Sequence, residues 1–198
     1  MRKLALRSAL VFVSLTAGSA LAAQETPTFH AGEWAAEFTG GDAYSAGVMR
    51  FMNPRSALVF SFGGVLSRST ATPDGGEKEV STTRNLNLAL GVRRHTTVAS
   101  RVLATTELGL QLNYYRQNTH IPDAFGNPLA SHQSQTGYGL YGAIGGQYFV
   151  ASHLALGAVA TLNANFSTGR NESGGSGTDF RALSLTTGLR PIRITLYF

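Results

Sequence analysis

The 198-residue chain contains no cysteine, which excludes disulfide bonds and metal sites built on thiolates. Charged residues make up only 14% of the chain, well below the roughly 25% of an ordinary soluble domain. Lysine is nearly missing, because only Lys78 follows Lys3. Soluble β proteins usually place lysines on their water-facing strands and edges. The composition therefore disfavours an ordinary soluble β protein.

The first residues have the parts of a secretory signal peptide. Three basic side chains precede a short apolar segment at residues 9–17, and Ala20-Leu21-Ala22 has the small-x-small pattern that a signal peptidase accepts. The apolar segment is too short to span a bilayer as a permanent helix. We expect residues 1–22 to be cleaved, with Ala23 as the alternative last residue, and 23–198 to form one exported domain.

The basic character of the whole chain depends strongly on this signal segment. It carries three of the 16 basic residues and none of the 11 acidic ones, so the rest of the chain has a net charge of only +2. A nucleic-acid-binding domain needs a basic surface. We therefore expect no nucleic-acid partner.

The rest of the chain alternates apolar and polar residues with the period of two that is typical of β-strands, and it shows no sustained helical period. From Leu86 to Val92, for example, apolar side chains alternate with Asn, Ala and Gly. Several of these runs exceed ten residues, the length that a tilted strand needs to cross a bilayer. The pattern predicts eight strands, at residues 33–39, 44–52, 57–67, 83–94, 101–116, 135–150, 153–167 and 180–197.

The links between these runs alternate between two kinds. Those at one end are short, whereas those at the other end, apart from a tight link at 40–43, are long and rich in Gly, Ser, Pro, Asn and Asp. Transmembrane barrels combine short periplasmic turns with longer external loops in this way. We expect the long links, residues 68–82, 117–134 and 168–179, to be external loops that hold the binding site for an unknown ligand.

Alternation leaves open which face of the sheet points inward. A soluble lipocalin-like barrel would place the apolar face inside, whereas a membrane barrel would turn it to lipid. The polar face consists of Asn, Gln, Thr and Gly with few charges, which suits a narrow interior better than a water-facing surface. Aromatic residues near both strand ends are typical of interfacial girdles. The expected interfacial aromatics are Trp34, Tyr114, Tyr138, Tyr148 and Phe166.

On this interpretation Leu88, Leu110 and Leu156 face lipid, while Asn87, Gln111 and Asn163 face the lumen. The lumen also receives charged side chains, and buried charges are costly unless they are paired. We expect one polar network in the interior and place Arg93 and Arg101 at its rim. The members of the network are Glu37, Arg50, Glu107, Arg190 and Arg193.

The last strand changes parity at Arg190-Pro191, because Leu185 and Leu189 hold odd positions and the apolar residues after them hold even ones. A β-bulge at the proline would insert one residue and return the apolar face to lipid. The ending, Ile192-x-Ile194-x-Leu196-Tyr197-Phe198, resembles that of small bacterial outer-membrane β-barrels of the OmpA/OmpX type. This resemblance implies an all-β, eight-stranded antiparallel up-and-down transmembrane barrel in the outer membrane. It also implies that the barrel-assembly machinery recognises the tail through Ile194, Leu196 and Phe198.

The chain contains only weak matches to sequence motifs for catalysis, nucleotide binding or metal binding. Residues 137–142 match G-x-G-x-x-G, but they lie inside a predicted strand, whereas a dinucleotide site needs a strand followed by a helix. His120, Asp123 and His132 share one predicted loop, and this spacing is not specific for a metal. No Ser–His pair stands at the outer end of a strand. We therefore assign no catalytic, cofactor or metal residues.

The sequence predicts a monomeric barrel in contact with outer-membrane lipid and lipopolysaccharide. An eight-stranded barrel has an interior that its own side chains fill, so we expect a structural or surface-interaction role exerted through the external loops. Two alternatives stay open at this point. One is a lipid-modifying enzyme of the outer membrane, and the other is a narrow channel for small solutes.

Overall fold

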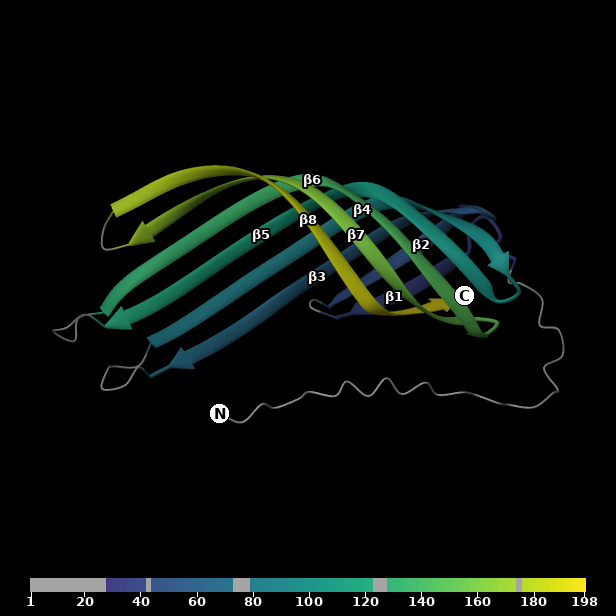
Figure 1. The fold of residues 1–198 in the computed structure, drawn as a ribbon, viewed down its shortest axis with the longest axis horizontal. Coiled ribbons are helices and arrows are strands. Elements are labelled where there is room, and N and C mark those ends of the chain that lie inside the picture. Colours follow the sequence, from purple (N-terminus) through teal and green to yellow (C-terminus); the bar gives the residue numbers. More distant parts are fainter. Residues whose placement is uncertain (1–27, 42–43, 73–78, 123–127, 174–175) are drawn as a thin grey trace, which may run out of the picture.

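A computed structural model describes residues 28–41, 44–72, 79–122, 128–173 and 176–198. All eight strands pair antiparallel with their neighbours in sequence, and β1 pairs with β8 to close a barrel (Figure 1). The predicted all-β up-and-down barrel is confirmed. The strands are β1 (Trp34–Gly40), β2 (Ser45–Asn53), β3 (Ser56–Ala71), β4 (Glu79–Ala99), β5 (Val102–Pro122), β6 (Pro128–Ala151), β7 (Leu154–Ser173) and β8 (Ser176–Tyr197).

The expected signal peptide, residues 1–22, lies outside the described residues. Within the described residues, no helix has both the length and the apolar character needed to cross a membrane.

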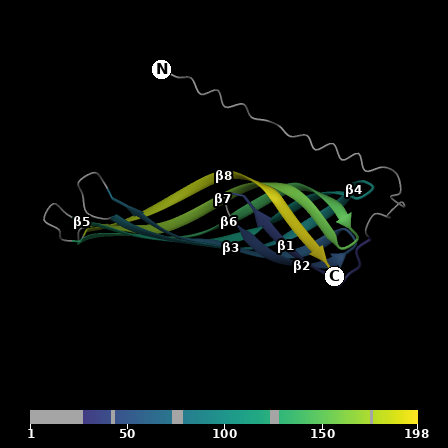
Figure 2. The same cartoon turned by 90° about the horizontal axis from the view of Figure 1, so that it is seen from below.

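The strands differ greatly in length. β1 and β2 contain 7 and 9 residues, whereas β6 contains 24. The pairing of β3 with β2 ends at Gly63, and that of β8 with β1 ends at Ile192. In the described residues the barrel is therefore closed only over the half that carries the short turns. Beyond that half, β3–β8 continue as an open, curved sheet (Figures 1 and 2).

The predicted long loops are wrong over most of their length. β4 begins at Glu79, β5 continues to Pro122, and β7 and β8 together include most of 168–179. These strand extensions carry polar residues on both faces, so the alternation that marks a half-buried strand is missing from the sequence. Backbone ladder hydrogen bonds do not depend on that alternation and form here nonetheless. Residues 73–78, 123–127 and 174–175 of the three predicted loops lie outside the described residues.

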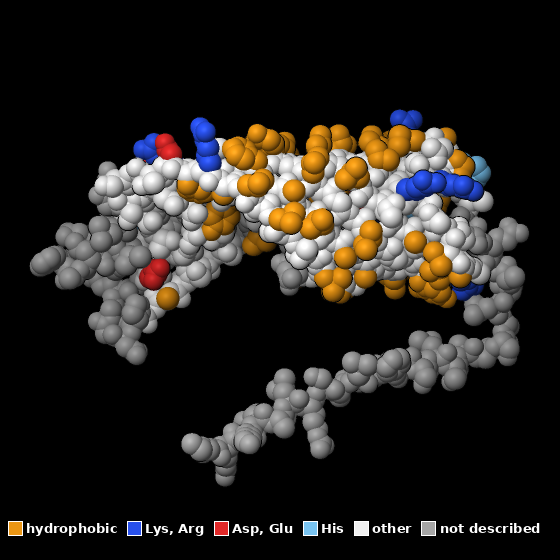
Figure 3. Space-filling model, turned by 45° about the horizontal axis from the view of Figure 1, so that its top comes forward, with side chains coloured by type: hydrophobic (Ala, Val, Ile, Leu, Met, Phe, Trp, Pro, Cys, Tyr) orange, Lys and Arg blue, Asp and Glu red, His pale blue; other side chains and the backbone are white. Residues whose placement is uncertain are grey.

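The apolar face of the sheet points outward, as the sequence predicts. Leu110 is 62% exposed on the outside, while the adjacent Gln111 is only 8% exposed inside the barrel. Apolar side chains gather over the middle of the barrel, and basic side chains appear towards its two ends (Figure 3). The aromatic residues expected at the interfaces all lie on this outer face: Trp34, Tyr114, Tyr138, Tyr148 and Phe166.

A β-bulge at Pro191 changes the parity of β8, as predicted. The register with β7 passes from Val159↔Arg190 to Gly157↔Arg193, so β8 contains one residue more than β7 over this interval. Gly41 lies beside the bulge with φ of +148°, and a Cβ added to it would stand 3.0 Å from Cδ of Pro191. A side chain at residue 41 would therefore be both strained and crowded. The bulge keeps the end of β8 in phase with the apolar surface.

Candidate functional site

An aromatic cluster fills the lumen at the short-turn end. Phe29, which precedes β1, stacks on Phe51 at 4.3 Å and on Tyr197 at 5.0 Å between ring centroids. Phe149 and His95 complete the cluster. All five side chains point inward, so this end of the barrel is closed by apolar packing. The role of Phe29 is not predictable from the sequence, because a single aromatic residue before the first strand carries no periodic signal.

A group of buried charges lies next to this cluster, with Arg93 at its centre. Arg93 is 2% exposed. Its Nε donates to Oε2 of Glu107 at 2.7 Å, and its terminal nitrogens donate to both carboxylate oxygens of Glu37, one of them at 2.9 Å. The hydroxyl of Tyr141 donates to the second oxygen of Glu107 at 2.5 Å. Both carboxylates are therefore satisfied by donors from other strands.

Arg193 supplies the second cation of this network. Its Nε lies 3.5 Å from Oε2 of Glu37, and its terminal nitrogen donates to Oγ1 of Thr105 at 3.1 Å. The network thus contains two carboxylates and two guanidinium groups, and its charge is balanced. Its charged members come from β1, β4, β5 and β8, so the ion pairs cross the lumen and connect strands that are not all neighbours.

The structure brings together three of the five residues that the sequence placed in the network: Glu37, Glu107 and Arg193. Arg190 also points inward, but it donates to hydroxyl groups, Oγ1 of Thr39 at 3.2 Å and Oγ of Ser45 at 2.9 Å.

Two placements of arginines by the sequence analysis are wrong. Arg50 lies on the outer face, with Cζ 5.6 Å from the centroid of the Trp34 ring. It faces outward because its neighbours Met49 and Phe51 occupy the inward positions of β2. Arg93 is the central cation and not a rim residue, because β4 continues to Ala99 and carries the barrel end further from residue 93 than predicted.

The true rim at the short-turn end has a local ion pair of its own. Glu33 accepts a hydrogen bond from the backbone N–H of His30 at 2.9 Å and contacts Nδ1 of the same residue at 2.8 Å. The backbone hydrogen bond, followed by the imidazole contact, lowers the pKa of Glu33 below its ordinary value. This pair is exposed and stands apart from the buried network.

A layer of amide side chains follows the buried charges towards the open end. The Gln111 amide donates to Oδ1 of Asn165 at 2.7 Å, and Asn113 donates to the same oxygen at 3.1 Å. Asn87 in turn donates to Asn113. The cavity enclosed between the charges and this layer measures about 50 Å³, room for about one or two water molecules. Over the described residues, side chains therefore occupy the lumen from the short-turn end to the amide layer.

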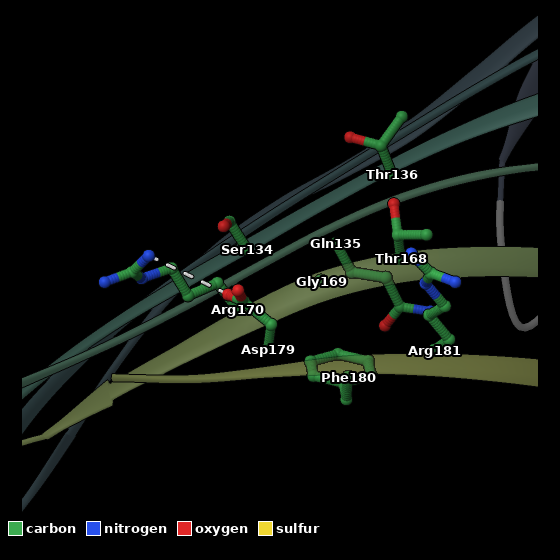
Figure 4. Close-up of a pocket in the computed structure, with 9 residues that line it drawn as sticks. All are labelled: Ser134, Gln135, Thr136, Thr168, Gly169, Arg170, Asp179, Phe180 and Arg181. Atoms are coloured by element: carbon green, nitrogen blue, oxygen red, sulfur yellow. Dashed lines mark ion pairs between the residues drawn. The ribbon is translucent and has the colours of Figure 1, made fainter. Parts of the chain in front are cut away.

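The open end offers two wider hollows. One, of about 240 Å³, lies above the amide layer and is lined by Tyr115, Gln135, Ser184 and further polar side chains. The other, of about 750 Å³, extends over β6, β7 and β8 (Figure 4). In it the guanidinium of Arg170 lies 3.8 Å from the carboxylate of Asp179. The larger hollow contains residues from two of the segments predicted to bind an external ligand, among them Ser134, Arg170 and Asp179, whereas the smaller one contains none.

His120 and His132 approach one another on β5 and β6, with ring centroids 6.4 Å apart. Nδ1 of His132 lies 3.0 Å from the side-chain oxygen of Asn118. Asp123, the third residue of the loop considered for metal binding, lies outside the described residues. Among the residues that the structure does describe, no group of three or more His, Cys, Asp or Glu side chains is arranged to hold a metal ion.

No protein-family model and no curated protein matches the sequence of this chain. Solved structures do match. A major outer membrane protein from Thermus thermophilus is 15% identical, with a TM-score of 0.62 over 85% of this chain and 100% of that chain. CarO from Acinetobacter baumannii is 11% identical, with a TM-score of 0.45 over 85% of this chain and 98% of that chain. The chain thus has the fold of small bacterial outer-membrane β-barrel proteins, as its sequence predicted.

Proposed function

We propose that this protein is a monomeric, non-conducting outer-membrane barrel that presents an interaction surface to the outside of the cell. The observation that carries the proposal is the filled lumen. An aromatic cluster, a charge network and an amide layer follow one another along the barrel and leave a cavity of about 50 Å³. The long ends of β3–β8 support an external role, because extended strands form a rigid scaffold for recognition.

The purified barrel is expected to show no regular conductance steps in planar lipid bilayers. A variant with Phe29 and Phe51 both changed to alanine serves as the comparison, because it removes the two rings that stack at 4.3 Å in the aromatic cluster. Steps of uniform size from the unaltered protein would contradict the proposal and favour the narrow channel. Absence of steps together with full insertion, verified by the heat-modifiability of the band on a gel, would support it.

The same proposal includes assembly by the barrel-assembly machinery through the C-terminal tail. Ile194, Leu196 and Phe198 are all exposed on the outer face, in phase with one another. Deleting Phe198 is expected to slow the appearance of the heat-modifiable form several-fold in a reconstituted assembly reaction. Phe60→Ala, which removes another outward phenylalanine, is the matched control. Equal rates for the two variants would contradict recognition of the tail.

A further inference from the structure

Two arginines stand directly opposite one another on the outer face of the barrel. Arg84 of β4 and Arg116 of β5 are cross-strand partners, and both side chains are exposed. Arg68 of β3 is paired with Thr82, which places it diagonally next to Arg84 on the same face. Like charges directly opposite on adjacent strands destabilise a sheet. An anion bound between them would remove this repulsion.

No carboxylate offsets these charges within the described part of β3–β5. The acidic residues there, Glu79 and Glu107, occupy odd positions of β4 and β5 and so belong to the opposite face. Glu107 is already bound to Arg93. By contrast, Arg170 on β7 has two carboxylates nearby, at 2.7 Å from Glu172 and 3.8 Å from Asp179. Among the described residues, the three arginines therefore form a basic patch without a carboxylate partner, whereas Arg170 has two.

An apolar groove lies below this patch on the same outer face. It has a volume of about 700 Å³ and is lined mainly by outward side chains, among them Leu88, Leu110, Leu112, Tyr138 and Phe166. The pair Leu88↔Leu112 lies four residues along the strands from Arg84↔Arg116, a distance of about 13 Å. The exposed side chains of Leu86 and Tyr114 bridge this interval. Basic patch and groove thus form one continuous amphiphilic surface.

We propose that Arg68, Arg84 and Arg116 bind the phosphate groups of an anionic glycolipid of the outer leaflet, with its acyl chains in the groove. Guanidinium groups match phosphate oxygens in a bidentate geometry. The patch lies at the edge of the apolar belt that is nearer to the long ends of β3–β8. Under the proposed function, this edge is at the level of the lipid headgroups of the outer leaflet. The inference rests on the proposed function, because that function identifies the surrounding membrane as the outer membrane. The apolar groove is the feature that favours a lipid over free phosphate as the ligand.

Native mass spectrometry of the purified full-length protein tests the site, with bis-phosphorylated lipid A as the probe. The double variant R84Q/R116Q is expected to bind lipid A at least about tenfold more weakly than the unaltered protein. R50Q/R94Q is the matched control, because it removes two exposed arginines of the outer face towards the short-turn end. This control is expected to keep full affinity, and the unaltered protein is expected to bind dephosphorylated lipid A as weakly as R84Q/R116Q binds the intact lipid.

Three results would overturn the arginine site: undiminished affinity of R84Q/R116Q, an equal loss in R50Q/R94Q, or equal binding of the dephosphorylated lipid. Inorganic phosphate that competes at the same concentration as lipid A would overturn the role of the groove.

Cysteine labelling on intact cells tests the proposed function separately, because the chain has no cysteine of its own. Thr178→Cys should react with a membrane-impermeant maleimide and Ser152→Cys should not; the reverse pattern would overturn the assumed orientation.

Discussion

Replacing Arg93 with leucine is expected to lower the free energy of unfolding of the barrel by about 3–5 kcal/mol. Arg93 donates to Glu37 and to Glu107 and is 2% exposed. Without it, Glu37 would keep Arg193 as its ion-pair partner, and Glu107 would keep no ion-pair partner among the described residues. Two buried carboxylates that lose their main donor face both desolvation and mutual repulsion. Leucine fills part of the space but replaces none of the hydrogen bonds.

The measurement is a urea unfolding curve of the protein in lipid vesicles, read by the heat-modifiability of the band on a gel. Arg94→Gln is the control, because residue 94 is next in sequence but exposed on the outer face. Adding Glu37→Gln and Glu107→Gln to the Arg93→Leu variant should recover part of the loss, since neutral amides tolerate burial without a cation better than carboxylates do. Equal unfolding midpoints for Arg93→Leu and Arg94→Gln would refute the structural role of the network.

Placing an arginine at Leu110 is expected to lower the free energy of unfolding by about 2–4 kcal/mol in a bilayer. Leu110 is 62% exposed on the outer face and lines the apolar groove. Hydrocarbon surrounds it there under the proposed function, and a charged guanidinium at such a depth must either lose its hydration or distort the bilayer. The effect depends on depth and should fade towards the ends of the apolar belt.

Thr136→Arg tests this dependence on depth. Residue 136 is exposed on the outer face of the neighbouring strand, paired with Tyr114 near the basic patch. An arginine there should cost at most about 1 kcal/mol, because it lies near the interface. Both variants are compared by urea unfolding in phosphatidylcholine vesicles. If Leu110→Arg proved as stable as Thr136→Arg, hydrocarbon would not surround the outer face at residue 110.

The sequence predicted the existence of all eight strands and, apart from Arg50 on β2, the side on which the residues of the network lie, but it predicted the strand ends poorly. Where one side of a strand meets lipid and the other a polar lumen, apolar and polar residues must alternate, as around Leu110 and Gln111. Beyond the apolar belt the strands carry polar residues on both sides, so β4 and β5 show no clear apolar–polar alternation near residues 79–82 and 117–120. The bulge at Pro191 was predictable because it reverses a parity that can be counted along the chain.

The sequence by itself thus determined a membrane-type barrel, because lipid contact imposes a local period of two on each strand. It also supplied Glu37, Glu107 and Arg193 as inward charges, since parity alone decides the side of the sheet. Only the tertiary structure decided that Arg93 lies at their centre, that Phe29 closes the lumen, and that Arg84 stands opposite Arg116. These facts depend on the stagger between strands and on the closure of the barrel, and local alternation carries no information about either.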